Sequence, residues 1–537
     1  MKKITELKLG FSDAENYKRK ENKELFNAIF VKNVFLEQLM SPSSFFLIGE
    51  KGTGKTAYAV YLSNSVYQGN KSELKYIRET DYQKFVNLKQ KHHLLLSDYE
   101  SIWKVIILLL LAKSINVEEL EGNPFSKNKK FKIILEAIDE YYNHAFSPEI
   151  LAALNLIENS KIAAELVSKH LKAGGEQTAQ TSFQESRFQV NLLYLQREFE
   201  RALSDIKTKT HHILFIDGID IRPGSIPYDE YLECIKGLGN AIWNLNNDFF
   251  SQLKYSNGRF RAVLLIRPDI FNSIGLQNST NKILDNSVFL DWKTTYPDYR
   301  HSQIFGLIDR LLNAQQGKKF EHGEAWDFYF PWKSPTTSPS RGHDPSFYKL
   351  LRLSYSRPRD LVTILKILQQ VAIEDKTQEN TFFSLENFDS DKFQNRYSEY
   401  LMGGIKDQLS FYYTDKDYEF FLKFFNHFEG KGRFDYNEYL SAYKKFTEDI
   451  LNYHTGIPEF VDNPDKFLQF LYDTNILCYI ENSRSSNPSF SWCYRDRSPA
   501  NISPKVKSNV RYEIHYGLLK SLNLGFGSKK RKKYEKG

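Results

Sequence analysis

Residues 49–56 read Gly-Glu-Lys-Gly-Thr-Gly-Lys-Thr, and this octapeptide decides the fold. It fits the phosphate-binding pattern G-x-x-x-x-G-K-[ST] at every fixed position. The apolar, β-prone residues 44–48 precede it, and residues 57–62 can continue from it as a helix. A strand, a loop and a helix in this order are the context that the pattern requires. A chance glycine turn is the weaker interpretation, and we expect a nucleoside triphosphate to bind here.

Each residue type in the octapeptide has a chemical reason. Gly49 and Gly54 let backbone N–H groups turn towards a phosphate, and the N-terminus of the following helix adds partial positive charge. Lys55 would reach the β- and γ-phosphates, and the Thr56 hydroxyl would be a ligand of Mg²⁺. With ATP and Mg²⁺ as cofactors, the predicted binding residues are Gly49, Glu50, Lys51, Gly52, Thr53, Gly54, Lys55, Thr56 and Ala57.

A second motif lies at residues 212–220, which read His-Ile-Leu-Phe-Ile-Asp-Gly-Ile-Asp. Four apolar residues indicate a buried parallel strand that ends in a carboxylate at the carboxyl edge of the sheet. Asp217 would hold Mg²⁺ together with Thr56, the role of the second acidic motif in such proteins. An apolar run that ends in Asp is common by itself, so its pairing with the octapeptide carries the prediction.

The remaining strand candidates complete a sheet. They are short, apolar and bounded by polar or turn residues, at 74–78, 261–266 and 287–290. With 44–48 and the strand before Asp217 they make five. The sequence therefore predicts an α/β fold with a doubly wound parallel-sheet P-loop NTPase core.

A large helical insertion separates the two motifs. Thr56 and Asp217 are 161 residues apart, whereas one crossover unit takes about 30 residues. We place the insertion at about 81–209, with a loop at 171–182. Helical periodicity covers 101–115, 130–142, 148–170 and 188–206.

The part of the chain after the sheet has several predicted segments. An amphipathic helix at 299–313 is followed by an extended surface segment at 320–345 and by helices at 345–353 and 360–373. Residues 389–397 have the composition of a linker. The predicted domains are the P-loop core at 1–345, a helical lid and linker at 346–400, a C-terminal domain at 401–525 and a basic tail at 526–537.

The C-terminal domain combines helices with a hairpin. Helices are predicted at 417–428, 435–449 and 464–473, and two strands at 476–480 and 489–494 flank a polar turn. Helices followed by a β-hairpin are the layout of a winged helix. The prediction is a winged-helix-like α+β domain.

Three further groups are candidates for chemistry at the phosphate end. Many ATPases place Glu directly after the acidic strand, but Gly218 stands there, so Asp220 is the candidate that orients the attacking water. Arg267 follows the strand 261–266 and could sense the γ-phosphate. Arg357 and Arg359 flank Pro358 at a helix start and could reach the phosphates from a lid. The alternatives are a capping Asp, a solvent-facing Arg and a surface salt bridge to Asp360. The predicted catalytic set is Lys55, Asp217, Asp220 and Arg267.

These motifs together resemble a known class. Residues 215–220, Phe-Ile-Asp-Gly-Ile-Asp, resemble the second acidic motif of STAND P-loop ATPases, particularly NACHT and KAP relatives, in which an Arg-Pro like Arg267-Pro268 is a sensor. Residues 357–360 are similar to the lid helix start of origin-recognition-type AAA+ proteins and of a bacterial P-loop ATPase family often found in phage-defence loci. Residues 9–15 and 515–522 also resemble that bacterial family. The resemblance implies an ATPase in antiviral defence.

Two features depart from the NACHT pattern. NACHT proteins usually have Glu after the second Asp, where Ile221 stands, and the long insertion is atypical of them. Both departures favour slow hydrolysis, as in a nucleotide switch, over rapid turnover.

Composition narrows the setting. The 537 residues contain 41% hydrophobic and 15% aromatic residues, which is ample for packed cores. The three cysteines lie far apart, and no secretory signal opens the chain, so we expect a cytoplasmic protein. The longest apolar run, 105–112, is too short to span a bilayer and is read as a buried helix, without a membrane partner. Adjacent histidines at 92–93 and 211–212 have poor spacing for a metal.

Charge distribution leaves a second function open. Net charge is 73 − 66 = +7, and residues 484–537 contribute 13 − 3 = +10 of it. The basic side chains of this segment could track a nucleic-acid backbone. Aromatic residues interleaved with them could stack on bases, namely Phe490, Trp492, Tyr494, Tyr512 and Tyr516. The first hypothesis is a switch or assembly ATPase that acts with a protein effector or as a homo-oligomer. The alternative is a nucleic-acid-binding loader or remodeller, and a kinase is a third, weaker reading.

Overall fold

The computed structural model describes residues 1–77, 96–144, 185–222, 226–253, 258–335, 342–375, 381–453, 461–482 and 488–525. The chain forms two compact units. The parallel-sheet unit consists of Phe35–Ile48 and Lys55–Phe289, and the C-terminal unit consists of Met1–Val34, Gly49–Gly54 and Leu290–Gly537. The octapeptide 49–56 therefore contributes residues to both units.

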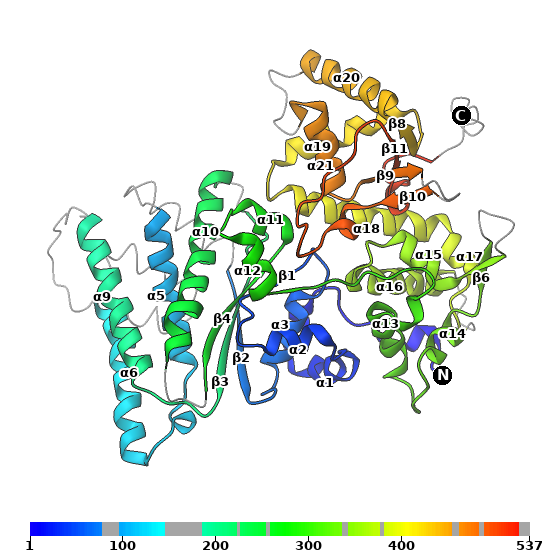
Figure 1. The fold of residues 1–537 in the computed structure, drawn as a ribbon. Coiled ribbons are helices and arrows are strands. Elements are labelled where there is room, and N and C mark those ends of the chain that lie inside the picture. Colours follow the sequence, from blue (N-terminus) through cyan, green and yellow to red (C-terminus); the bar gives the residue numbers. More distant parts are fainter. Residues whose placement is uncertain are drawn as a thin grey trace, which may run out of the picture. The chain divides into compact units, whose positions relative to one another are not determined.

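A five-stranded sheet forms the centre of the parallel-sheet unit (Figure 1). Its order is β2-β3-β4-β1-β5 and every pair is parallel, which confirms the predicted α/β class and its five strands. The bounds are β1 (Phe46–Ile48), β2 (Asn70–Tyr76), β3 (His211–Asp217), β4 (Phe260–Ile266) and β5 (Ser287–Phe289). All residues of β1 and β4 are buried, as expected for parallel strands covered on both faces.

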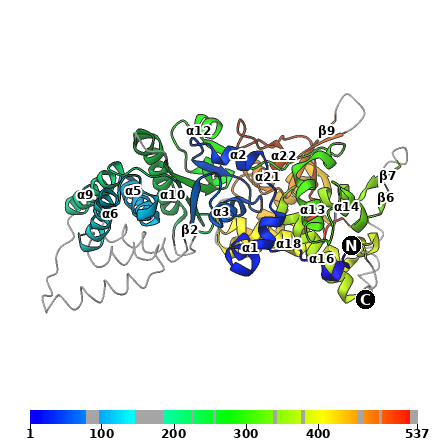
Figure 2. The same cartoon turned by 90° about the horizontal axis from the view of Figure 1, so that it is seen from below.

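Helices cover both faces of this sheet. Helix α3 (Lys55–Ser63) lies on one face, and α5 (Leu96–Ser114) and α10 (Tyr228–Asn244) lie on the other (Figures 1 and 2). The indole N–H of Trp103 in α5 donates to the Cys234 carbonyl in α10 at 3.1 Å. The other helices of this unit are α2 (Val34–Met40), α6 (Pro124–His144), α9 (Glu185–Ser204), α11 (Pro268–Ser273) and α12 (Ser279–Asn286).

The helical insertion is confirmed where the structure describes it. Helices α5, α6 and α9 cover three of its four predicted helices, and residues 105–112 are buried within α5 as expected. The predicted helix 148–170 and loop 171–182 lie outside the described residues. Within the described chain, no helix is both long enough and apolar enough to cross a lipid bilayer.

The first part of the C-terminal unit contains a buried helix where the sequence predicted an extended surface segment. Within 320–345 the chain forms α14 (Glu324–Tyr329) and pairs β6 (Lys333–Pro335) with β7 (His343–Pro345). Trp326 is 1% exposed and stacks on Phe330 with ring centroids 4.1 Å apart. The prediction was wrong because aromatic burial outweighs the flanking Gly, Pro and Ser residues. Neighbouring helices are α1 (Lys20–Ile29), α13 (Gln303–Asn313), α15 (Ser346–Leu353) and α16 (Pro358–Glu374).

The predicted linker at 389–397 is also wrong. Residues there end α17 (Leu385–Asp389) and begin α18 (Asp391–Leu409). Ser390 caps α18 by accepting a hydrogen bond from the Phe393 N–H at 3.2 Å. Phe393, Tyr397 and Leu401 recur at four-residue steps and are buried.

The last part of the chain places helices beside an antiparallel sheet. Helices α19 (Asp415–Phe424), α20 (Tyr436–Tyr453) and α21 (Pro464–Asp473) confirm the three predicted ones, and β9 (Leu477–Asn482) pairs with β10 (Pro488–Ser491) as the predicted hairpin. Two strands were missed, β8 (Arg433–Asp435) and β11 (Arg511–Ile514), which extend the sheet to the order β10-β9-β11-β8. Residues after Ser491 form α22 (Cys493–Asp496) instead of continuing the strand. Winged-helix identity stays a prediction, and the tail 526–537 lies outside the described residues.

Candidate phosphate-binding site

The structure brings Thr56 and Asp217 together across 161 residues. Thr56 lies in the first turn of α3, Asp217 ends β3, and the threonine hydroxyl donates to Asp217 Oδ2 at 2.6 Å. The other carboxylate oxygen accepts the Gly218 N–H at 2.8 Å. These are the two residues predicted to hold Mg²⁺, and both offer oxygen, the ligand that Mg²⁺ prefers.

Burial tunes the Asp217 carboxyl. The residue is 8% exposed, and this burial raises its pKa above the usual value, with the Asp220 charge acting in the same direction. The hydrogen bond from Thr56 and the Lys55 charge oppose the rise. A cation beside Asp217 would favour the ionised carboxylate for the same electrostatic reason.

Lys55 and Asp220 also lie close together, next to Thr56 and Asp217. The Lys55 ammonium is 3.7 Å from Asp220 Oδ2, and the lysine side chain is only 6% exposed. Asp220 Oδ1 is buried and has no hydrogen-bond partner among the described residues. The predicted catalytic acid therefore lies beside the predicted phosphate-binding lysine, and phosphate oxygens would compete with it for the ammonium.

Backbone geometry explains why glycine follows Asp217. Gly218 has φ +94°, and a Cβ at this position would lie 2.5 Å from the Ile77 carbonyl oxygen. A glutamate, common here in ATPases, would be strained and would clash. Asp220 is the next acid after Gly218 in the chain.

Arg267 lies at the carboxyl end of β4, the strand next to β3. It is 1% exposed, and its Nε and Nη2 donate to the two oxygens of Asp269 at 3.0 and 2.7 Å. The solvent-facing alternative is therefore wrong. The buried Asp269 pair compensates its charge and fixes the orientation of the guanidinium at this edge.

The loop 49–54 has the conformation that its glycines allow. Gly52 and Gly54 have φ of +93° and +98°, values that favour glycine. Thr53 closes a turn because its N–H and its hydroxyl both donate to the Glu50 carbonyl, at 3.2 and 2.9 Å. The Trp292 indole N–H donates to the Thr53 carbonyl at 2.8 Å, which anchors the loop within the C-terminal unit.

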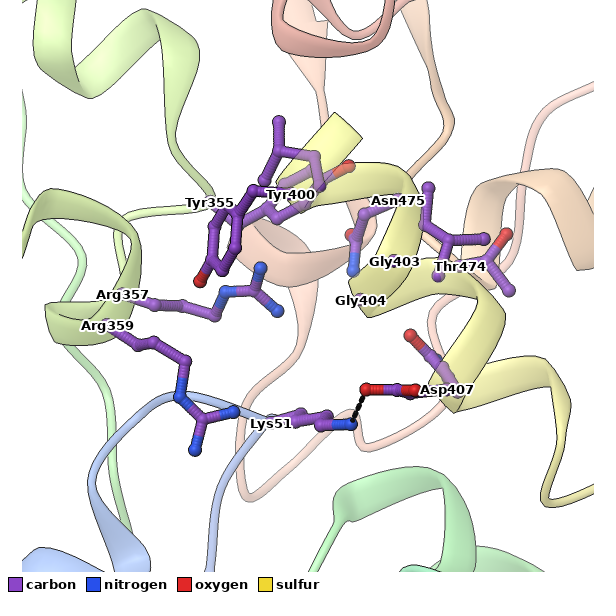
Figure 3. A pocket seen from close by; sticks show the side chains of 13 residues that line it. Lys51, Tyr355, Arg357, Arg359, Tyr400, Gly403, Gly404, Asp407, Thr474 and Asn475 are labelled. Carbon is purple, nitrogen blue, oxygen red and sulfur yellow. Dashed lines mark hydrogen bonds and ion pairs between the residues drawn. The ribbon is translucent and has the colours of Figure 1, made fainter. Parts of the chain in front are cut away.

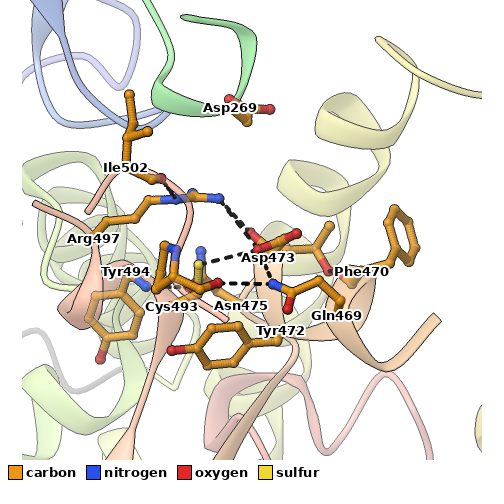
Figure 4. A network of polar contacts seen from close by, with 12 residues as sticks. Asp269, Gln469, Phe470, Tyr472, Asp473, Asn475, Cys493, Tyr494, Arg497 and Ile502 are labelled. Carbon is orange, nitrogen blue, oxygen red and sulfur yellow. Dashed lines mark hydrogen bonds and ion pairs between the residues drawn. The ribbon is translucent and has the colours of Figure 1, made fainter. Parts of the chain in front are cut away.

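A buried arginine near the C-terminus binds the loop 49–54. Arg497 is 3% exposed, and its guanidinium forms an ion pair with Glu50. Its Nε donates to the Ile502 carbonyl at 3.2 Å, and Nη2 is 3.9 Å from Asp473 Oδ1 (Figure 4). Arg497 cannot be singled out from the sequence, because it stands within a basic segment and no local pattern links positions 50 and 497.

The two arginines at the start of α16, Arg357 and Arg359, make different contacts. The Arg359 backbone N–H donates to the Gly52 carbonyl at 3.2 Å, so the start of α16 contacts the loop. Arg357 instead pairs with Asp360 at 2.9 and 3.0 Å. This pair is not the surface salt bridge of the alternative reading, because Asp360 is fully buried. Lys51 reaches Asp407 of α18 at 2.6 Å (Figure 3).

In residues 488–525, the described part of the basic C-terminal segment, most of the aromatic side chains named for stacking are buried. Trp492, Tyr494 and Tyr512 are 6%, 7% and 0% exposed and belong to the core. Arg495 lies over the Tyr494 ring, 5.6 Å from its centroid. Of the five aromatic residues named for stacking, Tyr516 is the exposed one at 42%.

No cluster of three or more His, Cys, Asp or Glu side chains suited to a metal ion occurs in the described ranges. A Mg²⁺ bound with phosphates needs only one or two protein ligands, so Thr56 and Asp217 fit it. His212 is 1% exposed, and burial lowers its pKa to about 4, which keeps it neutral. Positions 92–93 lie outside the described residues.

Comparisons with known proteins returned no match, either to a protein-family model or to a curated protein.

Proposed function

We propose that this chain is an ATPase that binds ATP and Mg²⁺ at residues 49–57 and uses the bound nucleotide as a switch. The observation that supports this most is the 2.6 Å hydrogen bond from Thr56 to Asp217. A hydroxyl at the start of the helix after a glycine loop, joined to a carboxylate at the end of a parallel strand, is the arrangement that Mg²⁺-nucleotide sites of this type use.

Each side chain then has a role in the proposed reaction. Lys55 binds the β- and γ-phosphates, and Thr56 and Asp217 hold the cation. Backbone N–H groups of 51–56 line the phosphates, except that of Thr53, which donates to the Glu50 carbonyl. Mg²⁺ would neutralise charge on the phosphates and orient them. Asp220, 3.7 Å from Lys55, orients the attacking water, and Arg267 at the end of β4 senses the γ-phosphate.

The contacts of the loop 49–54 support a switch. Arg359 contacts Gly52, Arg497 binds Glu50 and Trp292 binds Thr53, so three segments of the C-terminal unit depend on the loop conformation. A nucleotide changes a conformational equilibrium only through its different affinity for the two states. Direct contacts to the phosphate-binding loop provide such a difference.

The test measures ATP binding by calorimetry and phosphate release in the same preparation. Wild-type protein should bind ATP with Mg²⁺ and release phosphate slowly without an added acceptor, which distinguishes an ATPase from a kinase. Lys55→Ala should weaken ATP binding at least a hundredfold, whereas Lys75→Ala, on β2, should not. Equal ATP binding by Lys55→Ala and wild type would contradict the proposal.

The effector or homo-oligomeric partner, and the role in antiviral defence, stay predictions from the resemblance. Nucleic-acid binding is not proposed, because the aromatic residues assigned to stacking are mostly buried.

A further inference from the structure

A pocket opens in the C-terminal unit beside the loop 49–54 (Figure 3). Its volume is about 340 Å³, within the range of small-molecule sites. Four parts of the unit line it: Lys51 of the loop, residues of 355–359 before and at the start of α16, residues of 400–408 in α18, and 474–475 after α21. None of the roles proposed above uses this space as a whole.

Positive charge dominates the pocket lining. Three basic side chains, Lys51, Arg357 and Arg359, line it with one carboxylate, Asp407. Asp407 pairs with Lys51 and the buried Asp360 pairs with Arg357, so Arg359 provides the positive charge that no carboxylate of the described residues balances. The Arg359 guanidinium donates from Nε to the Ser12 carbonyl at 3.0 Å, and its outer nitrogens extend towards Lys51 in Figure 3. Planar guanidinium groups match phosphate oxygens in geometry as well as in charge.

Tyr355 gives an independent reason to expect a ligand. The residue is 4% exposed, and its hydroxyl is buried without a hydrogen-bond partner among the described residues. Figure 3 shows this hydroxyl pointing into the space beside Arg357. A buried hydroxyl without a partner is costly, so a group that accepts or donates a hydrogen bond there would relieve the cost.

Gly403 and Gly404 line one wall of the pocket and place no side chain in it. They lie inside α18, where glycine is unfavourable relative to alanine. A Cβ added at either position would meet no atom within 4 Å. Packing therefore does not demand glycine here, whereas a ligand that approaches the helix backbone would.

We propose that this pocket binds a small phosphate-bearing molecule at a second site, which shares Lys51 with the nucleotide site at residues 49–57. The phosphate lies between Arg359, Lys51 and the Tyr355 hydroxyl, and the amide of Asn475 faces the remainder of the ligand (Figure 3). Since Lys51 and Arg359 also belong to or contact the loop, the ligand acts as a regulator of nucleotide binding.

The experiment uses the full chain with Lys55→Ala, which disables the nucleotide site. Inorganic phosphate, pyrophosphate and adenosine 5′-monophosphate are titrated separately by calorimetry. At least one probe should bind, and Gly404→Phe, which fills the pocket, should remove that binding. Tyr355→Phe should weaken it about tenfold without lowering the melting temperature, because only the unpaired hydroxyl is lost.

Gly404→Ala is the matched control for the filling variant. Alanine should raise the melting temperature, because it favours the helix, and should reduce probe affinity less than phenylalanine does. The proposal is overturned if none of the three probes binds the Lys55→Ala protein, or if Gly404→Phe folds and binds the probe as well as its parent. Failure of the ATPase proposal leaves this result unaffected, because Lys55 is absent throughout.

Discussion

The two halves of the phosphate-binding octapeptide differ in how they are held. In the parallel-sheet unit, Lys55 and Thr56 meet Asp220 and Asp217, which come from the end of a buried strand. In the C-terminal unit, residues 49–54 are held by side chains and backbone from far along the chain, above all Arg497. Residues 55–56 carry the groups to which we assign the proposed chemistry, and residues 49–54 contact α16, α18 and the segment after α22.

The substitution with the largest expected effect removes the side chain that holds residues 49–54. Arg497→Met removes the guanidinium that pairs with the Glu50 carboxylate, which is 15% exposed, and we expect a loss of about 3–5 kcal/mol in the free energy of unfolding of the C-terminal unit. Urea unfolding followed by tryptophan fluorescence measures it. The double variant Glu50→Gln/Arg497→Met should recover much of the loss, and the exposed Arg511→Met is the control. A loss below about 1 kcal/mol would show that the pair does not hold the loop.

Asp217→Asn tests the contact between Asp217 and Thr56, at the end of the octapeptide. Asparagine keeps the shape and can accept the Thr56 hydrogen bond, but it lacks the charge that holds Mg²⁺. Phosphate release should fall about a hundredfold, which corresponds to about 2.7 kcal/mol. Unchanged turnover would remove Asp217 from the site.

The same variant has a pH signature. Burial raises the pKa of Asp217, so the folded chain binds the proton more tightly than the unfolded chain does. Without Mg²⁺, the ionised carboxylate destabilises the fold at neutral pH, and this effect disappears as the pH falls through the raised pKa. Asp217→Asn should therefore raise the melting temperature at pH 7 in EDTA, with a gain that shrinks at lower pH. A gain that grows on acidification would contradict this sign.

Asp220→Asn should change ATP binding and phosphate release in opposite directions, and both changes should be smaller than the loss expected for Asp217→Asn. Loss of the carboxylate beside Lys55 should tighten ATP binding by up to about tenfold, since the ammonium no longer has a competing partner. Phosphate release should slow, because the amide cannot accept a proton. Asp229→Asn, an exposed residue of α10, is the matched control. Normal turnover in Asp220→Asn would exclude Asp220 from the reaction.

Lys51→Ala should have the smallest effect on folding. The side chains of Lys51 and Asp407 are 30% and 63% exposed, and such a pair contributes about 0–1 kcal/mol, less at high salt. Denaturant unfolding at two salt concentrations checks this. A large, salt-independent loss would mean that the pair is buried more deeply than the structure shows.

Local sequence was sufficient where local forces decide the structure. Four of the five strands contain short apolar runs that end in polar or turn residues, and the octapeptide encodes its own turn through Gly52 and Gly54. The exception is β2, which is mostly polar and begins at Asn70, four residues before the predicted start. Helix α18 could also have been found, because Ser390 provides a capping residue and Phe393, Tyr397 and Leu401 follow at helical spacing.

Other features depend on partners far away in sequence. The strand β11 pairs with β9 and β8, and its own four residues carry a weak strand signal. The Trp326 helix is specified by the aromatic cluster around it, which includes Phe347 at 5.0 Å between ring centroids. The Glu50–Arg497 pair joins residues 447 positions apart, and no periodicity records such a contact.

The most direct test of the central claim is calorimetry of ATP binding with Mg²⁺ and with EDTA, on wild type, Thr56→Val and Asp217→Asn. We expect wild type to bind ATP more tightly with Mg²⁺ than without. Each substitution should remove this Mg²⁺ dependence, with no further loss in the double variant. Absence of ATP binding by folded wild type, or full Mg²⁺ dependence in Thr56→Val and Asp217→Asn, would contradict the central claim.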